Sequence, residues 1–238
     1  MADDGSKALQ ALTEALQAAL GADLVTLMLY GSAARGAAVP GRSDLNVLLV
    51  LRDASALALG RAAPALAAWA RAGHAAPLIQ SERDWQASAD VFPLEVEDIR
   101  EAHRVLAGRD ATADLKTTRA NQRLELEREA RGKLIRLRAE YAVALVDGAT
   151  LAELLARATG TFLVLFRGAL RVAGQPVPAE PAALVRAVAA AAGFDAAPFL
   201  WALEARTRVP ARALKAQDPV AAAYLDAVQR FVDWVDGL

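Results

Sequence analysis

Cysteine is absent from the 238 residues of this sequence. Without thiols the chain forms no disulfide bond, holds no thiolate-bound metal and has no cysteine nucleophile. Histidine is scarce, because only His74 and His103 occur, far apart and without the spacing of a metal-ligand pair. We therefore expect surface or packing roles for both histidines.

The sequence also lacks an excess of charge. It has 27 basic and 28 acidic residues, a net charge of -1 and a pI of about 6.2, so no global basic field indicates binding to nucleic acid or to an anionic membrane. It contains no uncharged apolar run of about 18 residues, the length that a membrane span needs. The N-terminus, Met1-Ala2-Asp3-Asp4, is acidic where a signal peptide would be basic. We expect a cytoplasmic protein without a membrane partner.

What the sequence does contain is ample core material, with 55% hydrophobic residues, enough for one or two domains. Residues 1–111 hold 10 basic and 14 acidic residues, a net charge of -4, whereas residues 112–238 hold 17 and 14, a net charge of +3. Strand and glycine-turn patterns stop near the same point, and long helical runs follow. The sequence predicts two domains, 1–111 with a small mixed sheet and 112–238 all helical.

The first domain is predicted to be organised around two apolar strands at residues 24–30 and 47–51, joined by a glycine-rich loop. Asp44 and Asn46 precede the second strand and, being two residues apart, point to one face of it. Helical spacing or capping signals predict helices at 6–20, 55–72 (kinked or divided by Pro64) and 81–89, and a short strand is expected at 77–79.

Three short motifs follow one another along this stretch: Gly31-Ser32, Arg35-Gly36 and Ser43-Asp44-Leu45-Asn46. Together they resemble the signature of the DNA polymerase beta-type nucleotidyltransferases, a superfamily that includes the aminoglycoside nucleotidyltransferases and small nucleotidyltransferases of toxin and antitoxin pairs. The family pattern is Gly-Ser, a loop ending in Gly, and Ser-Asp-x-Asp. This chain departs from it at one position, because Asn46 stands where the second aspartate is expected.

The resemblance implies an enzyme that moves a nucleoside monophosphate from a nucleoside triphosphate, with ATP the expected donor, onto an acceptor hydroxyl of a small molecule or protein. Such a site needs backbone N–H groups for phosphate oxygens and carboxylates for Mg2+. Gly31 permits close backbone approach, Ser32 offers a hydroxyl and an amide, and Arg35 and Ser43 are further candidates for nucleotide binding. Asp44 is the candidate metal ligand and catalytic carboxylate. Asn46 is a neutral, weaker ligand, which weakens a two-metal site.

A third carboxylate is expected from residues 90–108, where Phe92, Leu94 and Val96 alternate with polar residues as in a strand. In the family a neighbouring strand supplies a carboxylate that binds metal or accepts the proton of the acceptor hydroxyl. The resemblance assigns that role to Glu95, with Glu97 as second choice. The alternative is an edge strand with a solvated acidic face.

The second domain begins with a predicted long helix at 114–145, and further helices are predicted at 150–172, 181–193, 195–207 and from Asp218 onward. Between Lys116 and Arg138 the first of them has eight basic residues against three glutamates. The candidates to face a triphosphate or an anionic acceptor are Arg131, Lys133 and Arg136, and Lys133 is assigned to the nucleotide. The alternative is a solvated helix with ordinary i,i+4 charge pairs. In the aminoglycoside-modifying members of the family, a helical bundle in this position helps to bind the acceptor.

The glycine loop does not match the common nucleotide-binding motifs. Residues 31–36 have the spacing GxxxxG, but Ala37-Ala38 follows where a Walker A loop needs Lys and Ser or Thr, and no GxGxxG occurs. The loop is also compatible with an ordinary strand-turn-strand unit. Because of Asn46, a nucleotide-binding or partner-binding protein that has lost catalysis is the second hypothesis, and a scaffold without a nucleotide site is the third. A homodimer is an option that the sequence leaves open.

Overall fold

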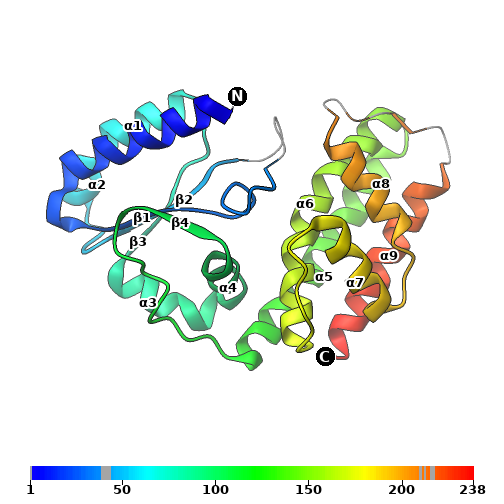
Figure 1. Cartoon of the computed structure of the whole chain (residues 1–238). Coiled ribbons are helices and arrows are strands. Elements are labelled where there is room, and N and C mark those ends of the chain that lie inside the picture. Colours follow the sequence, from blue (N-terminus) through cyan, green and yellow to red (C-terminus); the bar gives the residue numbers. More distant parts are fainter. Residues whose placement is uncertain (1, 39–43, 209–210, 212, 215–217) are drawn as a thin grey trace. The chain divides into compact units, whose positions relative to one another are not determined.

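The computed structural model describes residues 2–38, 44–208, 211, 213–214 and 218–238. The chain forms two compact units, Met1–Thr117 and Thr118–Leu238 (Figure 1). The sequence analysis placed the division slightly earlier, after residue 111. The first unit contains the mixed sheet and the second is helical, so the predicted fold class is confirmed.

The sheet of the first unit has the strand order β3-β2-β1-β4. Its strands are β1 (Leu24–Tyr30), β2 (Asn46–Leu51), β3 (Leu78–Ser81) and β4 (His103–Gly108). The central strand β1 runs antiparallel to both β2 and β4, whereas β2 and β3 are parallel. Helix α2 (Ala56–Arg71) makes the crossover that a parallel pair requires. The predicted strands at 24–30, 47–51 and 77–79 are therefore confirmed as β1, β2 and β3.

Helices cover both faces of this sheet (Figure 1). Leu27, Leu29 and Leu49 pack against α1 (Ala2–Leu20) and α2 on one face. Met28, Leu48 and Val50 alternate with them and pack on the other face against α3 (Glu82–Val91) and α4 (Pro93–Glu101). Both strands are apolar on both faces because each face is buried. A short 3-10 helix, Gly21–Asp23, joins α1 to β1.

Local signals account for the helix starts in this unit. The Ser55 hydroxyl accepts from the amide of Ala58 at the start of α2, and the Ser81 hydroxyl accepts from the amide of Asp84 at the start of α3. Helices α1, α2 and α3 thus confirm the predicted ones. Pro64 does not divide α2, which continues through it to Arg71.

The strand predicted across residues 92–97 is wrong, because Pro93–Glu101 forms helix α4. Pro93 occupies the first turn, where the missing N–H costs nothing and the fixed φ favours a helix. Val96 and Ile99 are three residues apart and both pack on the sheet. This spacing places them on one face of a helix, whereas in a strand they would point to opposite faces. The fourth strand is instead β4, which begins eleven residues after the predicted one and whose burial pattern shows little alternation.

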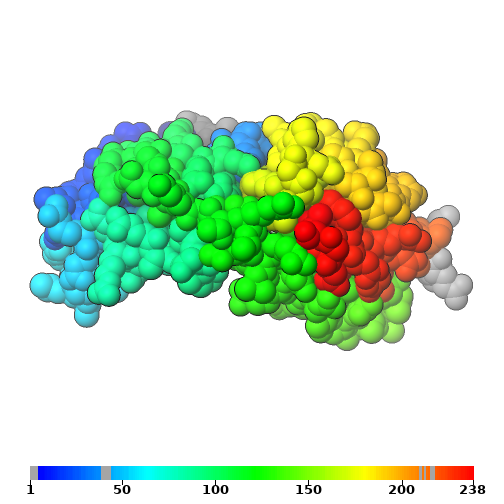
Figure 2. Space-filling view, turned by 90° about the horizontal axis from the view of Figure 1, so that it is seen from below, coloured from blue at the N-terminus to red at the C-terminus, as the bar shows by residue number. Residues whose placement is uncertain are grey.

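The second unit is a bundle in which α6 packs against each of the others. Its helices are α5 (Arg119–Ala144), α6 (Gly148–Val172), α7 (Pro181–Ala192), α8 (Ala197–Arg206) and α9 (Pro219–Asp236), which confirm the predicted helices to within a few residues at their ends. Figure 2 shows α9, in red, lying along α5, and the two helices pack together. The core is aromatic, with Phe166 in contact with Phe162, Phe199 and Phe231.

Helix α6 is long and apolar enough, by length and composition, to cross a membrane. Half of its most apolar window is nevertheless buried inside the bundle, against the four neighbouring helices. A central core helix of a water-soluble bundle meets the same criterion, so this helix does not by itself indicate a membrane protein.

Candidate functional site

The glycine-serine motif forms a tight turn directly after β1. Gly31 has φ +76°, a left-handed conformation that favours glycine, and the amide of Arg35 donates to its carbonyl oxygen at 3.1 Å. The amide of Ala37 donates to the Ser32 carbonyl at 2.9 Å, which closes a helix-like turn. Within the described part of the chain, the amide and hydroxyl of Ser32 make no hydrogen bond.

Asn46 lies against the open side of Gly31. Its Nδ2 atom is 3.0 Å from the position that a Cβ atom on residue 31 would occupy. Asn46 begins β2 and is the register partner of Tyr30 on β1, while the preceding Leu45 packs with the α1 and α2 cluster. Asn46 therefore faces the α3 and α4 side of the sheet, beside the turn. Glycine is favoured at position 31 by its backbone conformation, and a larger residue there would also require the Asn46 side chain to shift.

Glu95 of α4 reaches the end of β1. The Tyr30 hydroxyl donates to its Oε1 atom across 3.4 Å, and both side chains are partly buried. Burial raises the pKa of Glu95, the Asp98 charge raises it further, and the hydrogen bond from Tyr30 partly offsets this. Burial, followed by the Glu95 charge, raises the pKa of Tyr30. Glu95 consequently holds a proton to a higher pH than an exposed glutamate.

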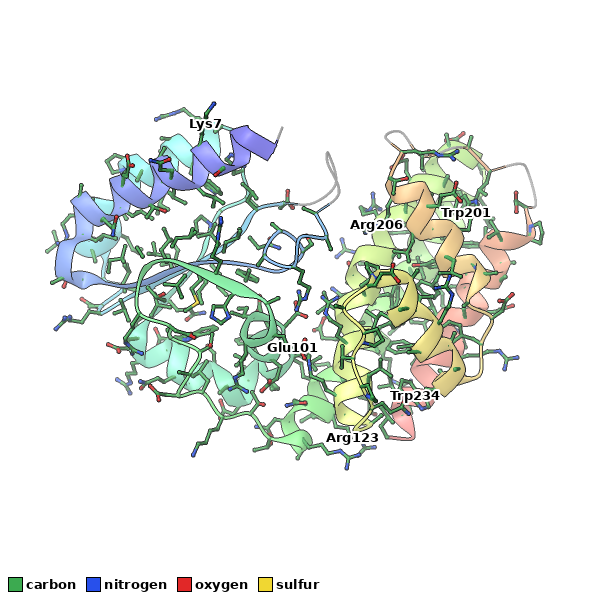
Figure 3. The ribbon with its side chains drawn as sticks, viewed as in Figure 1. Lys7, Glu101, Arg123, Trp201, Arg206 and Trp234 are labelled. Atoms are coloured by element: carbon green, nitrogen blue, oxygen red, sulfur yellow. The ribbon has the colours of Figure 1, made fainter. Side chains whose placement is uncertain are left out.

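Arg35 joins the turn to the same helix. Its Nη2 atom lies 2.9 Å from Oδ1 of Asp98 and 2.9 Å from the Asp98 carbonyl oxygen, and its Nη1 atom lies 3.2 Å from Oδ2. The two side chains are 12% and 10% exposed. Glu101, labelled in Figure 3 at the end of α4, lies 3.9 Å from the guanidinium. The turn is thus tied to α4 at two points, by Tyr30 to Glu95 and by Arg35 to Asp98.

The structure brings five of the residues selected from sequence to one end of the sheet: Gly31, Ser32, Arg35, Asn46 and Glu95. Asp44 precedes β2 and is exposed, and it has no hydrogen bond or ion pair within the described part of the chain. Ser43 lies outside the described residues. Glu97 points elsewhere, since it accepts from Thr117 and pairs with Arg100 at 2.5 Å.

Lys133 belongs to the helical unit, where it lines a pocket of about 250 Å³ between α5 and α6. The charged side chains that share this lining are Arg136, Glu140 and Arg157. Lys133 also pairs with Glu129 one turn earlier, Nζ to Oε2 at 3.7 Å. The i,i+4 charge pairing that the sequence analysis offered as an alternative is therefore present, together with a concave cationic surface.

The described side chains offer few ligands for a hard cation such as Mg2+. Among residues 2–38, 44–208, 211, 213–214 and 218–238, no group of three His, Asp or Glu side chains is arranged to hold a metal ion. Asp44 and Asn46 contribute a carboxylate and an amide oxygen from one short segment. Mg2+ usually takes one or two carboxylates and completes its shell with phosphate oxygens and water. This pair suits a cation that arrives with its ligand and does not supply the several carboxylates of a two-metal site.

Two residues in this site were not selected from the sequence, Tyr30 and Asp98. Asp98 was missed because residues 92–97 were interpreted as a strand, where Glu95 and Asp98 would lie on opposite faces. As members of a helix they are three apart and share one face. The signal that could have revealed them was Pro93, which is common in the first turn of a helix.

Comparisons with known proteins support the fold. No protein-family model matches the sequence, and no curated protein matches it. The structure is similar to the crystal structure of spectinomycin adenyltransferase AAD(9) from Enterococcus faecialis with ATP and spectinomycin, with a TM-score of 0.62 and 12% sequence identity. The match covers 95% of this chain and 98% of that chain. At this identity the likeness establishes the fold, and the resemblance to aminoglycoside nucleotidyltransferases predicted from the motifs is confirmed at that level.

Proposed function

We propose that this protein, which has the fold of an aminoglycoside-type nucleotidyltransferase, transfers a nucleoside monophosphate from a nucleoside triphosphate, with ATP the expected donor, to an acceptor hydroxyl. One observation carries the proposal: the Gly31 turn, Asn46 and the Tyr30–Glu95 pair adjoin one another at the same end of the sheet. The similar AAD(9) structure contains ATP and spectinomycin, which fits a donor nucleotide and a hydroxyl-bearing acceptor.

In this proposal the turn binds phosphate oxygens. The unbonded amide and hydroxyl of Ser32 donate to them, and Gly31 lets the backbone approach. Ser43 and Lys133 remain predicted nucleotide ligands. Arg35 is engaged with Asp98, so we assign it the role of holding the turn in shape, in addition to any charge that it presents to the triphosphate.

Asp44 and Asn46 are the residues that would hold Mg2+, and Glu95, which contacts the strand partner of Asn46, is the predicted third ligand. The cation, when bound, would neutralise charge on the triphosphate and on the departing pyrophosphate. Asn46 contributes a neutral amide oxygen where an aspartate would add an anion, so these residues bind the cation more weakly than two carboxylates would. The protein's own affinity for the donor then depends more heavily on the Ser32 turn.

Glu95 is the proposed general base, since its pKa is raised and it therefore holds a transferred proton more firmly than an exposed glutamate would. The acceptor oxygen bonds to the α-phosphorus, the bond from that phosphorus to the bridging oxygen breaks, and pyrophosphate leaves with the electron pair. The hydroxyl proton passes to Glu95, which the Tyr30 hydroxyl orients. Glu97 stays a second choice, although Thr117 and Arg100 occupy it.

A second function is favoured by Asn46, namely nucleotide or partner binding without turnover. This second function requires phosphate binding by the Gly31 turn but does not require the transfer step. Asn46→Asp discriminates between the two functions. If the substitution creates or strongly raises transfer or Mg2+-dependent nucleotide binding, the natural site is degenerate; if it changes neither, Asn46 is not a metal position. A cytoplasmic location stays a prediction from the sequence, and so does a homodimer.

The test combines binding and turnover in the full chain. Thermal shifts with nucleoside triphosphates, with and without Mg2+, should show stabilisation by ATP that depends on Mg2+. ATP radiolabelled in its α-phosphate should transfer label to an acceptor in a panel of hydroxylated metabolites, proteins and aminoglycosides. Ser32→Ala should weaken ATP binding about tenfold, while Ser6→Ala, an exposed serine on α1, should leave it unchanged. Absence of any thermal shift with ATP would instead support a scaffold without a nucleotide site.

A further inference from the structure

A groove between α5 and α6 concentrates positive charge within the helical unit. Three of its lining side chains are cationic, Lys133 and Arg136 from α5 and Arg157 from α6. One lining residue, Glu140, is anionic, and Thr161 adds a hydroxyl. The other lining residues are apolar: Leu137, Leu154, Ala158 and Phe162. The cavity of about 250 Å³ therefore has an apolar part and an excess of cations at its edges.

Glu140 holds the two guanidinium groups in place. The Arg136 Nε atom donates to its Oε1 at 2.9 Å, and the Arg157 Nη2 atom donates to its Oε2 at 2.9 Å. The hydrogen bond from Arg136, followed by that from Arg157, lowers the pKa of Glu140, so this bridge is ionised at neutral pH. One carboxylate thus spans the two helices and sets both arginines beside the groove.

Most of the donors on these arginines are left for another anion. Each guanidinium has five N–H bonds, and the bridge to Glu140 uses one from each. The Arg136 and Arg157 side chains are 78% and 69% exposed, so a solute reaches them. Two guanidinium groups that one carboxylate has already positioned suit phosphate or carboxylate oxygens, which accept in-plane pairs of N–H bonds.

We propose that the α5–α6 groove binds a phosphate or carboxylate group, and that the acceptor of the transfer reaction is an anionic metabolite rather than a polycationic aminoglycoside. The second part rests on the proposed function. A polycation would meet three cations against one anion in the lining, an arrangement that repels it. The triphosphate of the donor could present the same chemistry, so the experiment must separate these two sources.

Calorimetry on the full chain tests the site with three probes: inorganic phosphate, glycerol phosphate and spectinomycin. We expect glycerol phosphate to bind more tightly than spectinomycin, without any nucleotide present. Arg157→Gln and Lys133→Gln should each weaken glycerol phosphate about tenfold, the loss of one charge-assisted contact. The matched control is Arg128→Gln, an exposed arginine of α5 that pairs with Glu129 and does not line the groove, and it should change nothing.

A second titration with ATP and Mg2+ distinguishes the two sources. If the acceptor fills the groove, Arg157→Gln leaves ATP affinity unchanged while it weakens glycerol phosphate. If ATP affinity falls and glycerol phosphate does not bind, the groove serves the donor and the inference about the acceptor is overturned. Binding of spectinomycin in preference to both anions would also overturn it. Circular dichroism confirms folding of each variant, and Arg136→Gln, at another arginine of the groove lining, provides the result if Arg157→Gln does not fold.

Failure of the groove proposal is distinguishable from failure of the proposed function. Binding of glycerol phosphate by a protein that neither binds ATP nor transfers label would refute the nucleotidyltransferase and leave the anion site standing. Label transfer to spectinomycin alone would support the nucleotidyltransferase and refute the proposal that the acceptor is anionic.

Discussion

Arg35 and Asp98 form a buried, bidentate ion pair between the Gly31 turn and helix α4. The residues are 63 positions apart in the sequence, and the guanidinium also donates to the Asp98 carbonyl. Because Asp98 shares a helix face with Glu95, this one contact fixes both the Gly31 turn and the helix that carries the proposed base.

Asp98→Asn should destabilise the protein by about 3 kcal/mol, since it removes the nearer carboxylate charge from the largely buried Arg35 guanidinium. Chemical denaturation measures the change. The matched control is Glu101→Gln, which removes a half-exposed carboxylate 3.9 Å from the same guanidinium and should cost less than about 1 kcal/mol. Equal effects of the two substitutions would mean that the buried pair does not stabilise the fold.

Gly31→Ala should destabilise the protein by about 1–2 kcal/mol because an alanine at φ +76° is strained. Its Cβ would also lie 3.0 Å from Asn46 Nδ2, so the Asn46 side chain must move. Gly60→Ala is the matched control, since Gly60 lies in α2 with open space around it and alanine there should be neutral or slightly stabilising. Adding Asn46→Ala to Gly31→Ala should relieve the side-chain contact and leave the backbone strain. If the Gly31→Ala variant were as stable as the Gly60→Ala variant, this account of the turn would be contradicted.

The raised pKa of Glu95 gives a prediction with a definite sign. An acid whose pKa is higher in the folded state binds its proton more tightly there, so its contribution to stability is greatest below its ordinary pKa and is lost as the pH rises through the folded pKa. Glu95→Gln keeps the carboxamide neutral at every pH. The variant should therefore melt higher than the parent at neutral pH, by about 2–4 °C for each 1 kcal/mol in a chain of this size, and the gap should close in acid.

Glu95→Gln should also lower transfer, if the proposed function holds, by about 100-fold or more, since it removes the proton acceptor. The opposite responses of melting temperature and activity distinguish a functional carboxylate from one that only supports the fold. A variant that melts lower than the parent at neutral pH would show that ionised Glu95 is stabilising, contrary to the burial argument. Glu97→Gln, at the carboxylate that contacts Thr117 and Arg100, serves as the comparison.

Asn46→Asp should tighten Mg2+-dependent ATP binding about tenfold because it adds one anion with nearly the same shape. The contact with Gly31 is then kept, so a change in affinity reports charge and not packing. Titration calorimetry with and without a chelator measures it. No change in either binding or transfer would remove Asn46 from the list of metal ligands.

The sequence by itself determined the local features of the site. The strands at 24–30 and 47–51, the turn after Tyr30, the helix start at Ser81, and the division into a sheet unit and a helical unit all follow from signals that neighbouring residues carry. Apolar periodicity, capping hydroxyls and a glycine with positive φ act over a few residues, which is why a single sequence reveals them.

Only the tertiary structure decided which side chains meet. The six alternating residues at 92–97 match a strand as well as a helix, and packing of Val96 and Ile99 on the sheet selected the helix. In the helix, Glu95 contacts Tyr30, 65 positions away in the sequence, whereas Glu97 contacts Thr117. The same helix places Asp98 beside Arg35. Contacts over such separations depend on strand register and on how a helix docks, and these are properties of the assembled core rather than of any short segment.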